Sequence, residues 1–98
     1  MKAYVFGLLY MKSWEWYEKY YPETAKLISL HGGKYLASGV KPDMKEGEIQ
    51  PSAYVLLEFP DLESAEKWYE DPQYQPLIDL RKSGGRSEIF VIPGGTGT

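Results

Sequence analysis

Cysteine is absent from this 98-residue sequence, and histidine occurs only once, at His31. Without cysteine the chain has no disulfide framework, no thiol nucleophile and no thiolate zinc site. A metal site would have to combine His31 with carboxylates alone, so we expect neither a metal nor a cofactor. The glycine pairs at 32–33 and 84–85 follow predicted helices rather than strands, which argues against a phosphate-binding loop.

The sequence also lacks an excess of basic residues and a long hydrophobic run. Its formal charge is -3, whereas nucleic acids and anionic membranes require a concentrated basic patch, so we predict neither as a partner. The apolar stretch from Ala3 to Met11 is too short to span a bilayer as a helix. Bulky and charged residues follow it without a signal-peptide cleavage site, and we therefore expect a cytoplasmic protein.

The length predicts one domain over residues 1–93 and a flexible tail at 94–98. Runs rich in β-branched and aromatic residues predict four strands, and these lie at 3–10, 34–40, 53–59 and 87–92. The charged segment 41–51, with two prolines, predicts a long solvated connection.

Two helical regions separate the predicted strands. The first, at 13–31, contains Pro22, which predicts a kink or a restarted helix. The second begins after Asp61 as N-cap, and Asp71-Pro72 predicts its end and the start of a shorter helix. The order β-α-β-β-α-β predicts an α+β fold of the ferredoxin-like type, a four-stranded antiparallel sheet with helices on one face.

The strands do not alternate between apolar and polar residues, as a sheet with one face in water should. In the first strand, small or aliphatic residues alternate with larger ones: Ala3, Val5, Gly7 and Leu9 against Tyr4, Phe6, Leu8 and Tyr10. The small face suits packing under helices, whereas the aromatic face is larger than the apolar patches that monomers expose. We therefore predict that a second copy covers it, giving a homodimeric α+β barrel.

Four groups of residues occur along the chain in a recognisable order. They are His31-Gly32-Gly33-Lys34-Tyr35, Glu58-Phe59-Pro60, Ala65 with Trp68-Tyr69, and Asp71-Pro72-Gln73-Tyr74 running to Leu80-Arg81. Together they resemble the domain-of-unknown-function 1330 family, over about residues 2–93. The resemblance implies a dimeric α+β barrel and no particular reaction. Asp71 departs from the family pattern, in which a serine is expected, although either residue caps a following helix.

His31 has two interpretations. It is the only side chain whose ordinary pKa lies near neutral pH, which makes it a candidate general base. It also precedes Gly32-Gly33 at the end of a predicted helix. A glycine there supplies the left-handed cap and a histidine suits the helix dipole, so the structural role is the favoured interpretation.

Glu58 and Arg81 are the other catalytic candidates. Glu58 shares a strand face with Tyr54 and Leu56, the face assigned to the barrel interior. A buried carboxylate there would be paired or have a raised pKa, as general bases do. Arg81 is the expected partner of Glu58, or else it holds a substrate carboxylate.

An aromatic set supplies candidate ligand contacts with hydroxyl groups for orientation: Tyr35, Tyr54, Trp68, Tyr69 and Tyr74. We therefore predict a small homodimer that binds an aromatic or carboxylated molecule in a cavity between sheet and helices. The alternative is a cofactor-independent monooxygenase or isomerase with Glu58 or His31 as base and Arg81 as anion stabiliser, by analogy with other dimeric α+β barrels. A purely structural dimer, which needs no pocket, is a third possibility.

Overall fold

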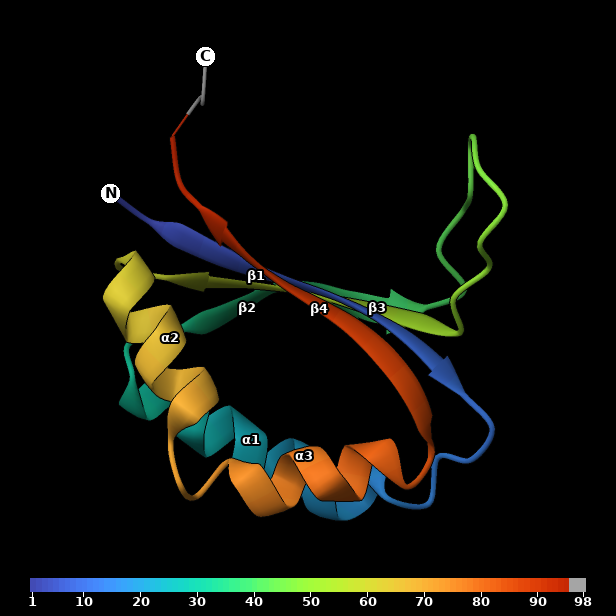
Figure 1. Cartoon of the computed structure of the whole chain (residues 1–98), viewed down its shortest axis with the longest axis horizontal. Coiled ribbons are helices and arrows are strands. Elements are labelled where there is room, and N and C mark those ends of the chain that lie inside the picture. The colour runs from blue at the N-terminus through green and yellow to red at the C-terminus, as the bar shows by residue number, and fades with distance from the viewer. Residues whose placement is uncertain (96–98) are drawn as a thin grey trace.

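The computed structural model describes residues 1–95. One antiparallel sheet has the order β2-β3-β1-β4, formed by β1 (Ala3–Met11), β2 (Lys34–Val40), β3 (Ala53–Phe59) and β4 (Gly85–Pro93). Helices α1 (Tyr17–Leu30), α2 (Leu62–Glu70) and α3 (Gln75–Lys82) all lie on one side of this sheet (Figure 1). The predicted fold class is confirmed. Residues 96–98 of the predicted tail lie outside the described part of the chain.

Helix α1 runs through Pro22 without interruption, so the predicted restart of the helix is wrong. Pro22 lies just beyond the first turn, and its missing N–H removes only the bond that the carbonyl of Glu18 would otherwise accept. Aromatic contacts support the helix start around this position. The rings of Trp16 and Tyr20 lie 5.0 Å apart, and those of Tyr17 and Tyr21 lie 5.6 Å apart. Packing thus outweighs the local preference of proline.

Two helix ends form as the sequence predicts. Gly32, with φ of 80°, ends α1, and the N–H groups of Gly32 and Gly33 donate to the carbonyls of Ser29 and Ile28 at 2.9 and 2.8 Å. This is the glycine cap that satisfies the last carbonyls of a helix. At the start of α2, Asp61 Oδ1 accepts a hydrogen bond from the Ser64 N–H at 2.7 Å.

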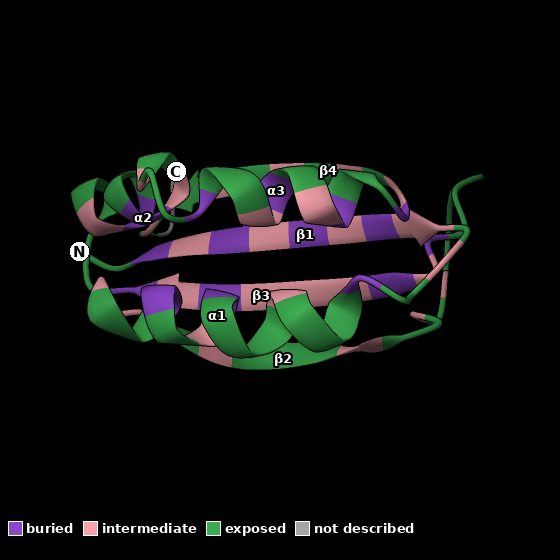
Figure 2. Ribbon diagram, turned by 90° about the horizontal axis from the view of Figure 1, so that it is seen from below, coloured by how far each residue is buried: buried purple, intermediate pink, exposed green. Residues whose placement is uncertain are grey.

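The two faces of the sheet differ as predicted. Along β1, the small residues facing the helices are buried and the larger residues between them are half-buried, which appears as alternating bands in Figure 2. Part of the core below the sheet consists of Val5, Leu57, Phe59, Ile28 and Trp68. The connection between β2 and β3 projects from the sheet on the side away from the helices (Figure 1). Among residues 1–95, therefore, no helix covers the aromatic face.

Candidate functional site

A cavity of about 430 Å³ lies between the helix-facing side of the sheet and the helices. Its inner wall is mostly apolar, with Val5, Leu57 and Ile89 from the strands and Ile28 from α1. Its exposed lining residues all belong to segment 14–21 or to β2. The cavity therefore opens between the start of α1 and the edge strand of the sheet.

Arg81 supplies a positive charge to the wall of this cavity. Its side chain is 3% exposed, and its Nη1 donates to the hydroxyl oxygens of Tyr74 and Tyr20 at 3.0 and 3.2 Å. Within residues 1–95, no carboxylate lies within ion-pair distance of it. A buried charge is ordinarily paired, because removing it from water is costly. Two neutral phenols solvate this guanidinium only in part.

The hydroxyl groups of Tyr20 and Tyr74 lie 2.5 Å apart. Burial raises the pKa of Tyr74 above its ordinary value, so its hydroxyl stays protonated at neutral pH. The pair carries two protons, and one of them suffices for the bond between the oxygens. Because both oxygens also accept from Arg81, the second proton is available to an acceptor atom of a ligand.

Three residues that line the cavity also carry a buried polar atom with no partner among the described residues. These atoms are Thr24 Oγ1, Trp68 Nε1 and Arg81 Nε. Trp68 and Arg81 contribute donors only, and Thr24 is the one member able to accept as well. These three atoms lie beneath the cavity surface, and donors outnumber acceptors among them, so the polar part of the wall suits a ligand with acceptor oxygens.

The cavity entrance is aromatic. Tyr21 on α1 faces Tyr35 on β2 with ring centroids 5.7 Å apart, and Tyr17 stacks on Tyr21. Trp14 and Trp16 also stack, with centroids 5.6 Å apart. Both tryptophans precede α1, and the turn at this point brings their rings together. A planar ring entering the cavity passes these side chains.

Five of the predicted site residues line the cavity: Tyr35, Tyr54, Trp68, Tyr74 and Arg81. Tyr54 does so although its side chain points to the other face of the sheet, where its hydroxyl lies beside Gly39. Tyr69 supports the wall instead, with its ring against those of Trp68 and Tyr74. Most of the predicted aromatic residues therefore line this one cavity.

Glu58 lies on the opposite face of the sheet from Arg81, so the expected pairing of these two residues is wrong. Its Oε1 contacts Lys2 Nζ at 3.0 Å and Lys34 Nζ at 3.6 Å. The hydrogen bond from Lys2 is the main cause of a lowered pKa at Glu58. A carboxylate held in this way is a weak proton acceptor.

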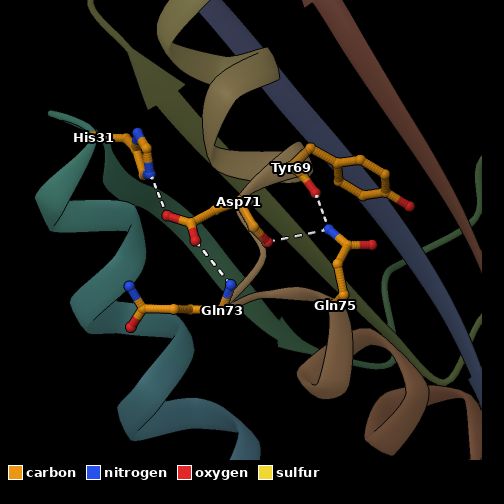
Figure 3. A network of polar contacts seen from close by, with 5 residues as sticks. All are labelled: His31, Tyr69, Asp71, Gln73 and Gln75. Atoms are coloured by element: carbon orange, nitrogen blue, oxygen red, sulfur yellow. Dashed lines mark hydrogen bonds and ion pairs between the residues drawn. The ribbon is translucent and has the colours of Figure 1, made fainter.

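His31 lies outside the cavity lining and contacts Asp71. Its Nε2 is 2.8 Å from Asp71 Oδ2, and the two side chains are 20% and 11% exposed. Figure 3 shows this contact joining the end of α1 to the turn between α2 and α3. The geometry favours the structural interpretation of His31, with Asp71 as its partner across the fold.

Replacing Asp71 by asparagine should remove an acid-sensitive part of the stability. The hydrogen bond from His31, followed by that from the Gln73 N–H, lowers the pKa of Asp71. A lowered pKa stabilises the fold above the unfolded pKa of about 3.9, and this contribution disappears as pH falls through the folded value. In urea unfolding, Asp71→Asn should therefore be less stable than wild type at pH 6, and the difference should shrink below pH 3. A difference independent of pH would contradict this assignment.

The sequence interpretation did not identify the part of the lining that α1 contributes. The lining includes Trp16, at the N-cap position before α1, and Tyr20, Thr24 and Ile28 within the helix. They occur at every fourth position, which is the spacing of one helix face. The signal was present, but the expected break at Pro22 concealed it.

Within residues 1–95, no helix has both the length and the apolar character needed to cross a membrane. Over the same range, no three histidine or carboxylate side chains are grouped so that they could hold a metal ion.

Solved structures show where this fold recurs. A protein of unknown function from Rhodopseudomonas palustris is 16% identical, with a TM-score of 0.77 over 97% of this chain and 83% of that one. A dimeric ferredoxin-like protein of unknown function from Jannaschia sp. is 12% identical, with a TM-score of 0.67 over 96% and 100%. SnoaB, a cofactor-independent oxygenase from Streptomyces nogalater, is 12% identical, with a TM-score of 0.63 over 97% and 93%. At these identities the likeness establishes the fold alone.

The sequence itself places the chain in a family. No curated protein matches it. The model of one family does match, over residues 2–95, which is nearly the whole chain. The chain therefore belongs to the family described as a domain of unknown function, DUF1330.

Proposed function

We propose that this protein binds a small aromatic molecule carrying a carboxylate or similar acceptor oxygen in the cavity beneath its sheet. The observation that supports this proposal is Arg81, buried in the cavity wall without a carboxylate partner among the described residues. The volume of about 430 Å³ falls within the usual range of about 300–1,000 Å³ for small-molecule sites. An anionic oxygen of the ligand would pair with the charge of Arg81 and accept a hydrogen bond from the tyrosine hydroxyl that is free to donate.

The proposal is tested by titrating the protein with 1-naphthoate and following amide chemical shifts. The largest changes should occur at residues that line the cavity, on α1, β2 and α3. The neutral 1-naphthamide serves as the matched control and should bind more weakly, because its NH₂ group meets mostly donors. Shifts concentrated on the uncovered face of the sheet would refute the proposal.

A cofactor-independent oxygenase or isomerase is the second candidate. SnoaB, which shares the fold, is named as such an oxygenase. The general bases first considered, Glu58 and His31, both lie outside the cavity lining. Of the three predicted catalytic residues, only Arg81 lines the cavity, where it would stabilise an anion.

The substitution Glu58→Gln tests whether Glu58 acts as a general base. Because Glu58 is bound by lysines on the other face, we expect the affinity for 1-naphthoate to change less than about twofold, within the small effect of remote sites. Any turnover found by screening phenols and aromatic acids should likewise persist. Loss of turnover with binding intact would restore Glu58 as a base.

We also propose that a second copy of the chain covers the aromatic face. Large apolar side chains remain exposed there, including Leu36, Phe90 and Ile92. Two neighbours of the same fold are named dimeric. Face-to-face packing of the two sheets would bury this surface in a two-fold dimer.

Sedimentation should accordingly give a particle of about twice 11.2 kDa. Phe90→Glu should shift it towards the monomer, because a charge would be buried against the partner's apolar face. Leu62→Glu, at an exposed apolar position on α2, is the matched control and should leave the dimer intact. A wild-type particle near 11.2 kDa would exclude the dimer.

A further inference from the structure

The hydrogen bond between His31 and Asp71 joins the same two segments of the chain that carry Tyr20 and Tyr74 of the cavity wall. Tyr20 and His31 both belong to the α1 segment, 11 positions apart, which corresponds to about 16 Å along a helix. Tyr20 contacts Tyr74, and His31 contacts Asp71, only three positions away on the facing segment. Helix α1 is thus attached to the α2–α3 region by polar contacts at two places, at Tyr20 and at His31.

Asp71 organises the turn that carries Tyr74. Its Oδ1 accepts from the Gln73 N–H at 2.8 Å, and its carbonyl accepts from the Tyr74 N–H at 2.8 Å. The Gln75 amide group donates to the carbonyls of Tyr69 and Asp71 at 2.9 and 3.2 Å (Figure 3). The backbone position of Tyr74 is therefore determined by the residue that His31 binds.

The hydroxyl oxygen of Tyr74 in turn accepts a hydrogen bond from Arg81. Its side chain is 1% exposed and packs against Trp68 with ring centroids 4.6 Å apart. The hydroxyl contacts of 2.5–3.0 Å that it makes weaken steeply with displacement or misalignment. A small shift of the turn or of α1 therefore changes the hydrogen bonds among Tyr20, Tyr74 and Arg81.

We propose that the His31–Asp71 contact positions the Arg81–Tyr20–Tyr74 donor group and thereby sets the affinity of the cavity for an acceptor oxygen. His31 acts here as a positioning residue and touches no ligand. The effect on affinity rests on the proposed function, whereas the effect on Tyr74 does not.

Two substitutions remove the contact in different ways. His31→Leu removes the donor, and Asp71→Ser keeps an oxygen able to cap the Gln73 N–H but is too short to reach His31. Glu23→Ala is the control, because it removes an exposed ion pair with Lys26 on the same helix. We expect the first two to weaken 1-naphthoate binding about fivefold to tenfold, comparable to the loss of one hydrogen bond, and the control to have no effect.

A double substitution distinguishes positioning from a general loss of stability. If His31 acts through the Tyr74 hydroxyl, His31→Leu should cause no further loss of affinity in a Tyr74→Phe background. Additive losses, or affinities within twofold of wild type in both single variants, would overturn the proposal.

A second measurement requires no ligand. The ¹³Cζ resonances of Tyr20 and Tyr74 report on their hydroxyl environments and should shift in His31→Leu and Asp71→Ser but not in Glu23→Ala. If wild type binds no 1-naphthoate, the proposed function fails, and these resonances still decide the positioning role. Unchanged resonances in both variants would refute it.

Discussion

Arg81→Met should abolish high-affinity binding of 1-naphthoate, with a loss of at least about 100-fold. Hydrogen bonds to a charged group are worth roughly twice those between neutral groups, and a guanidinium can form two of them with one carboxylate. Methionine fills a similar apolar volume and provides no donor. The tyrosine hydroxyls would remain, and they supply only neutral contacts.

The same substitution should leave the fold intact. Arg81 is buried without a carboxylate partner in the described part of the chain, so replacing it by an apolar residue removes an unfavourable desolvation. We expect urea unfolding to give Arg81→Met a free energy of unfolding equal to or above that of wild type. Gain in stability with loss of binding is characteristic of residues retained for function.

The matched control for Arg81 is Arg86→Met. Arg86 is exposed on the other face of the sheet, where it lies 3.8 Å from the centre of the Tyr10 ring. The Arg86→Met variant should bind 1-naphthoate with the affinity of the wild type. Equal losses in both variants would indicate non-specific charge attraction, and unchanged binding in Arg81→Met would remove Arg81 from the site.

Much of the fold could be predicted because its signals are local. The strands at 34–40 and 53–59, the glycine cap after His31 and the N-cap at Asp61 depend on neighbouring residues, and the structure has them where the sequence indicates. Pro22 is the exception. Its local preference is opposed by aromatic contacts within α1 and by packing on the sheet, which a local interpretation does not weigh.

The candidate site was predictable only in part. Trp68, Tyr74 and Arg81 lie on one short stretch and were all among the predicted site residues, whereas Tyr20 joins them from 61 positions before Arg81. Such a contact depends on how two helices pack, which no spacing reveals. The error at Glu58 has another cause: alternation along β3 already placed it on the face opposite to the helices, away from Arg81.

The largest loss of stability is expected for Phe59→Ala. Phe59 is fully buried and contacts the ring of Trp68, with centroids 5.5 Å apart. Gly33 fits closely over it, since a Cβ there would lie 2.5 Å from a ring carbon of Phe59. Removing the ring leaves a cavity that these neighbours fill poorly, so we expect a loss of about 3–5 kcal/mol. For a domain of this size, the melting temperature should fall by at least about 12 °C.

Phe90→Ala makes the same chemical change on the other face, where the side chain is 52% exposed. Within one protomer it should cost less than about 1 kcal/mol, because little apolar surface is lost from the core. Thermal unfolding of both variants, at a concentration where sedimentation shows one assembly state, measures the contrast. If the second copy covers this face, Phe90→Ala should dissociate into monomers at a higher protein concentration than wild type in sedimentation, since it loses apolar contact with the partner. Equal dimer dissociation constants for the two proteins would place the dimer contact elsewhere.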